Sequence, residues 1–236
     1  MTVSAPLRLM IYDRTCTRDL LTALDRKTGD SIGARVSRAI GRTAQRLPGP
    51  GLSHAWASGG VLYSALGRID DRKGFDNWGE ALRWLADYPG ARPIAEIQFW
   101  GHGKWGNARM DAEHLGLASL EGEHDHRAPL AAIRDRMVPG TGLWWFRTCE
   151  TFGAVPGQRF AEGWTDFFGC RAAGHTYIIG PWQSGLHSLG PGERPTWSVE
   201  EGLSAGTPEQ PTGALWSRPS EPNTISFLHG AVPAGY

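Results

Sequence analysis

The sequence predicts an α/β protein of three layers, in which helices cover both faces of a mostly parallel sheet. Two observations support this class. Short apolar runs typical of buried strands alternate along the chain with segments of helical periodicity, and parallel strands need such crossover connections. A chain of 236 residues is also long enough to bury one large core. We therefore expect a single domain over residues 1–236.

Five apolar runs predict the strands. Each is short and bounded by polar residues, glycine or proline, as expected of a buried strand. The runs are, in chain order, Leu7–Tyr12, Val61–Leu66, Ile94–Trp100, Leu143–Phe146 and Thr176–Ile179.

Four segments between these runs predict helices. The clearest signal is a capping-box pattern at Asn77 and Glu80, which starts a helix that ends before Pro89. The other three show apolar residues at helical spacing and are Ser31–Leu47, Pro129–Met137 and Gln158–Phe168. The polar stretch Lys104–Leu115 predicts a hairpin or loop.

The C-terminal part differs in composition from the rest. From about Ser184 the chain is rich in Gly, Pro, Ser, Glu and Thr, and it lacks the apolar residues needed for a core of its own. Residues 184–236 therefore predict long loops over the sheet edge, with one short strand at Thr224–Leu228.

Charge and cysteine content exclude several classes of partner. Lys plus Arg and Asp plus Glu both total 24, so no net field favours nucleic acid or an anionic membrane. No segment approaches the apolar length of a membrane span, and the run from Leu7 is too short for a signal peptide. Three cysteines without a CxxC pair fit reduced thiols, so we expect a cytoplasmic protein.

A histidine and a cysteine follow two of the predicted strands. His102 stands between Gly101 and Gly103 after Trp100, and Cys149 comes shortly after Phe146. The carboxyl ends of parallel strands share one edge of the sheet, so both side chains are expected there. A cysteine nucleophile needs such an exposed position and a nearby base. We expect Cys149 as nucleophile, His102 as general base, and the N–H groups of Gly103 and Cys149 as donors to an oxyanion.

These two strands, IQFWGHG and LWWFRTCETFG, resemble those of caspase-like cysteine peptidases. In that family a strand ending in His-Gly precedes, by about 50 residues, a strand ending in the nucleophile. With HGKWG, IYDRTCTRDLL and WSVEEG, the chain is most similar to the caspase-like domain of unknown function at the head of large bacterial surface proteins, over about residues 7–202. The resemblance implies a caspase-like fold, a peptide or protein substrate, no cofactor, and the same roles for His102, Cys149 and Gly103.

The chain also departs from the family pattern. Caspases have Gln, and their arginine- and lysine-specific relatives Asp, two residues before the nucleophile, where this chain has Arg147. A guanidinium on the pocket wall predicts a preference for Asp or Glu at P1. The loop GPWQSG matches the other side of the family's pocket, which makes Trp182 and Gln183 candidate substrate-binding residues.

Two other functions fit the sequence. A relative without activity would keep the fold as a peptide-binding or interaction module. Eleven tryptophans also suit a carbohydrate-binding protein or a glycoside hydrolase, which needs two facing carboxylates, with Asp13, Glu96 and Glu150 as candidates. Metal-ligand residue types also cluster between His114 and His126, but without HExxH spacing. We interpret that cluster as a solvated charged loop and predict no metal site.

Overall fold

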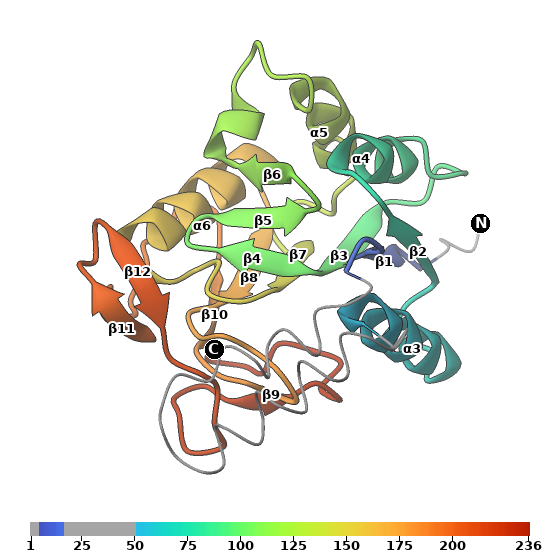
Figure 1. The fold of residues 1–236 in the computed structure, drawn as a ribbon. Coiled ribbons are helices and arrows are strands. Elements are labelled where there is room, and N and C mark those ends of the chain that lie inside the picture. Colours follow the sequence, from blue (N-terminus) through green and yellow to red (C-terminus); the bar gives the residue numbers. More distant parts are fainter. Residues whose placement is uncertain (1–4, 17–50) are drawn as a thin grey trace.

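A six-stranded, mostly parallel sheet forms the centre of the described part of the molecule. The computed structural model describes residues 5–16 and 51–236 (Figure 1). The strand order across the sheet is β2-β1-β3-β7-β8-β10, and the last strand alone runs antiparallel to its neighbour. The strands are β1 (Leu7–Asp13), β2 (Asp71–Phe75), β3 (Ile94–Trp100), β7 (Leu143–Arg147), β8 (Arg171–His175) and β10 (Leu186–Leu189).

Helices pack on both faces of this sheet, an arrangement compatible with a three-layer α/β fold (Figure 1). Within residues 51–236 they are α3 (Leu52–Ala65) on one face, and α4 (Trp78–Ala86), α5 (Arg127–Arg134) and α6 (Ala154–Phe168) on the other. Alternate residues of β1 serve the two layers. Leu9 and Ile11 join the main core with α4 and α6, whereas Met10 packs with Tyr63 of α3. Burial on both faces explains the continuous apolar run of β1.

Small sheets surround the central one. β4 (His102–Lys104), β5 (Asn107–Met110) and β6 (Glu113–Gly116) form an antiparallel three-stranded sheet, called the hairpin sheet below. The 3₁₀ helix η1 (Leu117–Leu120) follows it. Two further pairs are β9 (Trp182–Gln183) with β13 (Ile225–Ser226), and β11 (Leu203–Gly206) with β12 (Pro211–Ala214).

The structure confirms the expectations with the strongest local signals. The runs from Leu7, Ile94 and Leu143 are β1, β3 and β7, and the hairpin is present. The helix after Asn77 is α4, and the Asn77 side chain accepts a hydrogen bond from Glu80 N at 2.8 Å. The two remaining helices in this region are also present, although α6 begins earlier than expected, at Ala154. The predicted helix Ser31–Leu47 lies outside the described residues.

Two predicted strands are wrong. Val61–Leu66 belongs to α3 and the turn after it, and the strand at that edge is the polar β2. An edge strand is exposed to solvent along one side, so it does not need a continuous apolar run. The strand near the fifth run is β8, not Thr176–Ile179. The sequence of β8, RAAGH, has no apolar run because its small residues pack against a large ring. A Cβ on Gly174 would lie 2.5 Å from the Phe152 side chain.

Residues 184–236 contain more strands than the one predicted. Besides β13, they supply the β11–β12 pair and β10, which completes the central sheet. These strands are short and largely exposed or half-buried, so main-chain pairing defines them without an apolar pattern. No helix in the described ranges has both the length and the apolar character of a membrane span.

Candidate active site

His102 and Cys149 lie at the same edge of the central sheet. β3 and β7 are adjacent and parallel, and their register places Trp100 beside Arg147. His102 therefore stands two residues beyond the last pair on one strand, and Cys149 two residues beyond it on the other. This confirms the expectation that both follow neighbouring strands at their carboxyl ends (Figure 1).

Gly103 brings the hairpin sheet against the turn that carries Cys149. A Cβ at Gly103 would lie 2.1 Å from Thr151 Oγ1 and 2.7 Å from both the Cys149 carbonyl oxygen and Thr148 Cβ. Only glycine allows so close an approach. The turn is tied to the hairpin by a hydrogen bond from Gly106 N to the Thr151 carbonyl at 2.9 Å. The residues beside His102 and beside the thiol are thus in direct contact.

The Cys149 thiol is half-buried and neutral. Its sulfur lies 4.0 Å from the Ile179 carbonyl oxygen. Burial, and second to it the neighbouring Glu150 carboxylate, raise the pKa of the Cys149 thiol to about 12. The other described cysteines are more enclosed, since Cys16 and Cys170 are buried. Cys149 is therefore the one described cysteine that is partly exposed as a residue, and its thiol needs a base to become a thiolate.

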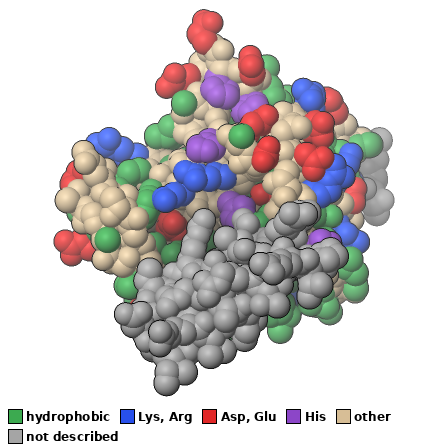
Figure 2. Space-filling model, viewed as in Figure 1, with side chains coloured by type: hydrophobic (Ala, Val, Ile, Leu, Met, Phe, Trp, Pro, Cys, Tyr) green, Lys and Arg blue, Asp and Glu red, His purple; other side chains and the backbone are tan. Residues whose placement is uncertain are grey.

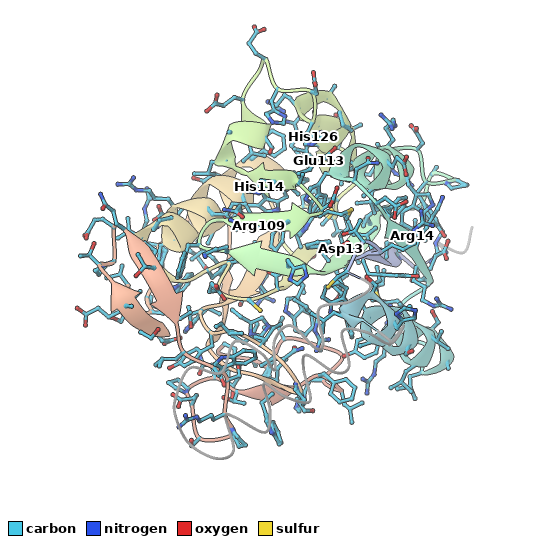
Figure 3. The ribbon with its side chains drawn as sticks, in the orientation of Figure 1. Asp13, Arg14, Arg109, Glu113, His114 and His126 are labelled. Atoms are coloured by element: carbon cyan, nitrogen blue, oxygen red, sulfur yellow. The ribbon has the colours of Figure 1, made fainter. Side chains whose placement is uncertain are left out.

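His102 occupies the first position of β4 and is partly exposed. Its ring meets the Trp56 ring of α3 edge-on, with centroids 5.4 Å apart. Across the hairpin sheet, His102 pairs with Arg109, which pairs in turn with His114. Directly opposed residues share one face of a sheet. Figure 3 shows Arg109 and His114 on the hairpin sheet, and Figure 2 shows basic and histidine side chains gathered on this face of the molecule.

The position of Arg147 contradicts the predicted pocket wall. Arg147 is 2% exposed, and its guanidinium lies over the rings of Trp100 and Trp145, 4.5 Å from each centroid. All five of its N–H donors have partners, which are Gln183 Oε1 (two bonds), Tyr63 Oη and the carbonyls of Phe227 and His229. No donor is left for a substrate carboxylate, so the acidic P1 preference loses its basis.

The two candidates from the GPWQSG loop have different surroundings. Gln183 is 5% exposed, and its side-chain oxygen is occupied by Arg147 at 2.7 and 3.2 Å. Gln183 is therefore part of the support for that buried cation. Trp182 is 45% exposed on β9, which leaves its ring available to a ligand.

Glu150 is a site residue that sequence reasoning considered only as a glycosidase carboxylate. It follows Cys149 directly, has a φ of 34°, and is 7% exposed. Its N–H donates to the Tyr177 carbonyl at 3.0 Å, but its buried Oε2 accepts no hydrogen bond from any described residue. Burial raises the pKa of Glu150 to about 7, against the attraction of Lys104 and Arg109. The signal in the sequence that could have identified Glu150 is its position directly after Cys149.

The alternative sites gain little from the structure. Asp13 accepts a hydrogen bond from Thr15 N at 2.7 Å, and Glu96 accepts one from the Gln98 amide on the same strand at 2.7 Å, so each is bonded within its own segment. In residues 5–16 and 51–236, no three His, Cys, Asp or Glu side chains are placed to hold a metal ion. Trp78, Trp144, Trp145 and Trp164 are wholly buried, which removes them from any sugar-binding surface.

A hollow of about 250 Å³ borders the hairpin sheet. Trp105, Leu117, Val155 and Pro156 provide its apolar wall, with Arg159 and Glu209 at its edge. Trp105 links it to the site, because a Cβ on Gly153 would lie 3.4 Å from the Trp105 ring.

Comparisons with known proteins identify no relative. No family model matches the chain, and no curated protein or solved structure is detectably similar to it.

Proposed function

We propose that this protein is a cysteine endopeptidase of the caspase-like type, with Cys149 as nucleophile and His102 as general base. One observation carries the proposal: Gly103, the residue after His102, packs against the Cys149 carbonyl at the shared edge of two parallel strands. A base and a thiol delivered to one edge by a rigid sheet are what acyl transfer needs. The mostly parallel sheet with an antiparallel last strand is compatible with the caspase-like fold.

The raised pKa of the thiol defines how the reaction would start. A resting thiolate is rare at neutral pH, so the thiol proton passes to His102 as sulfur attacks the peptide carbonyl. The carbonyl oxygen becomes an oxyanion near the N–H groups of Gly103 and Cys149. The C–N bond then breaks, and His102 returns the proton to the leaving amine. Water, deprotonated by His102, hydrolyses the thioester and restores the thiol.

The same thiol supports a second candidate function. A neutral, half-buried cysteine is also what a non-catalytic peptide-binding relative would retain. Exposed aromatic surface at Trp182 would serve such binding as well as it would serve catalysis.

Covalent labelling tests the proposal. A peptidyl acyloxymethyl ketone should label Cys149 much faster than Cys170, and His102→Ala should slow that labelling. Cys170→Ala, which removes a buried thiol outside the site, is the matched control and should label normally. The proposal fails if native Cys149 reacts no faster than Cys170. Peptide binding that survives Cys149→Ala, in a protein that never hydrolyses peptides, would favour the binding module.

A further inference from the structure

We propose that Glu150 recognises a basic substrate residue, Lys or Arg, flanking the scissile bond. This inference rests on the proposed peptidase function. It replaces the acidic preference expected from Arg147, because the structure encloses that guanidinium and leaves a carboxylate beside the nucleophile instead.

The carboxylate of Glu150 is held in place without a partner. The backbone is fixed on both sides, since Glu150 N donates to the Tyr177 carbonyl and the Glu150 carbonyl accepts from Gly153 N, each at 3.0 Å. The φ of 34° is a conformation that non-glycine residues rarely adopt. Buried polar atoms are almost always hydrogen-bonded, yet Oε2 has no such bond within the described chain. Glu150 combines this unpaired oxygen with a left-handed backbone conformation beside the nucleophile, and that combination supports its assignment to a ligand.

The two cations nearest to Glu150 make contacts with other groups. The Lys104 ammonium lies 4.8 Å from the centroid of the Trp105 ring, and Arg109 Nε donates to Asn107 Oδ1 at 3.1 Å. Both attract the Glu150 carboxylate through space, but neither donates a hydrogen bond to it. A substrate ammonium or guanidinium would supply the missing charge-assisted hydrogen bond.

The position of Glu150 next to Cys149 determines which substrate residue it can contact. Sulfur must reach the scissile carbonyl, so the side chains of the P1 and P1′ residues pass beside the residues that flank Cys149. Glu150 has its charged neighbours, Lys104 and Arg109, on the hairpin sheet, whereas Arg147 is bonded to Tyr63 of α3. The acidic subsite therefore belongs to the hairpin side of the nucleophile.

Recognition at Glu150 would also assist the chemistry. The Glu150 charge raises the pKa of the adjacent thiol, second only to burial. A bound cation neutralises that charge and makes the thiol easier to deprotonate. A basic substrate would thus gain in turnover as well as in affinity.

Peptide hydrolysis provides the main test. Internally quenched peptides carry Lys, Arg or norleucine at P1 or at P1′, and are compared in the native protein, in Glu150→Gln, and in Glu123→Gln, an exposed acid. We expect Lys or Arg to exceed norleucine at one of the two positions by about 10-fold or more in kcat/KM. Glu150→Gln should lose that preference, so that it cleaves the Lys, Arg and norleucine peptides with similar kcat/KM, and Glu123→Gln should keep it. A native protein without basic preference, or a preference that survives Glu150→Gln, would refute the inference.

The pH dependence gives a readout that a structural role would not move. The groups facing Glu150 are Lys104, Arg109 and the Cys149 thiol, and the Tyr177 phenol is engaged by Glu221. Since the pKa of Glu150 is about 7, the acid is increasingly protonated below that pH. KM for the basic peptide should rise about 10-fold per pH unit below pH 7, and KM for the norleucine peptide should not.

A binding measurement separates this inference from the peptidase proposal. N-acetyl-arginine amide and N-acetyl-norleucine amide are titrated into the native protein and Glu150→Gln by NMR. Selective binding of the arginine compound to the native protein supports the acidic subsite even if no peptide is cleaved. Equal, weak binding of both compounds to both proteins refutes the subsite, whatever the labelling of Cys149 shows.

Discussion

Replacing Gly103 with alanine perturbs the contact that joins the hairpin sheet to the Cys149 turn. The new Cβ would lie 2.1 Å from Thr151 Oγ1 and 2.7 Å from the Cys149 carbonyl oxygen, whereas ordinary contacts begin near 3.4 Å. The two segments must separate by about 1 Å. Overpacking of this kind costs about 1–3 kcal/mol. For a chain of this size the melting temperature should fall by about 2–12 °C.

The effect on the site should exceed the effect on the fold. A displacement of about 1 Å between a base and a nucleophile is enough to cost about 100-fold in rate. We therefore expect Gly103→Ala to reduce labelling of Cys149 by a peptidyl acyloxymethyl ketone by about that factor, at temperatures where circular dichroism shows a native fold.

Gly122→Ala is the matched control. A Cβ at Gly122 meets nothing within 4 Å, so melting and labelling should both match the native protein. If Gly103→Ala melts and labels like Gly122→Ala, the close packing is not what assembles the site, and the reasoning from Gly103 is wrong.

Three further predictions concern buried ionisable groups and are read from urea unfolding. Arg147→Met removes the donor to Gln183 Oε1 and the guanidinium that shares the Phe227 and His229 carbonyls with Tyr63, and it should destabilise by about 3 kcal/mol. Arg194→Met, at an exposed ion pair, should change stability by less than about 0.5 kcal/mol, and equal losses in the two variants would contradict the network. Burial lowers the pKa of His175 to about 3, so the folded state resists protonation, and the free energy of unfolding should fall by up to about 1.4 kcal/mol per pH unit below pH 6.5. His175→Asn should flatten that slope. An unchanged slope would exclude His175 as its source. Glu150 shows the opposite sign: its pKa of about 7 lies above its ordinary value, so the native protein should lose stability as pH rises from 4.5 to 7. Glu150→Gln should gain up to about 3 kcal/mol relative to the native protein between pH 4.5 and pH 8, and a constant difference would count against the raised pKa.

The sequence predicted the elements that have a strong local signal, such as a continuous apolar run or a helix cap. β1, β3 and β7 are buried on both faces and therefore read as continuous apolar runs, and α4 carries its own cap at Asn77. The sequence did not predict β2 and β8, because β2 is a polar edge strand and β8 has small side chains that pack against Phe152. Alternation of strands and helices predicted parallel strands, so the placement of His102 and Cys149 at one edge of the sheet was predictable from two strand ends.

The surroundings of the site were not predictable in the same way. The partners of Arg147 come from α3, β9 and the segment after β13, between 36 and 84 residues away in the chain. No local pattern in the sequence distinguishes a guanidinium enclosed by such distant groups from one on a pocket wall. The unpaired oxygen of Glu150 is likewise a property of the folded neighbourhood, since it depends on where Lys104 and Arg109 find other partners.

Arg147 donates hydrogen bonds to the carbonyls of Phe227 and His229, and these bonds fix the C-terminal segment to the central sheet. Tyr63 of α3 also donates to the Phe227 carbonyl, so a helix and the chain's tail share one anchor. Trimming the chain before Phe227 would remove two carbonyl acceptors of the buried Arg147 guanidinium. A shortened version for crystallisation or display should therefore keep His229.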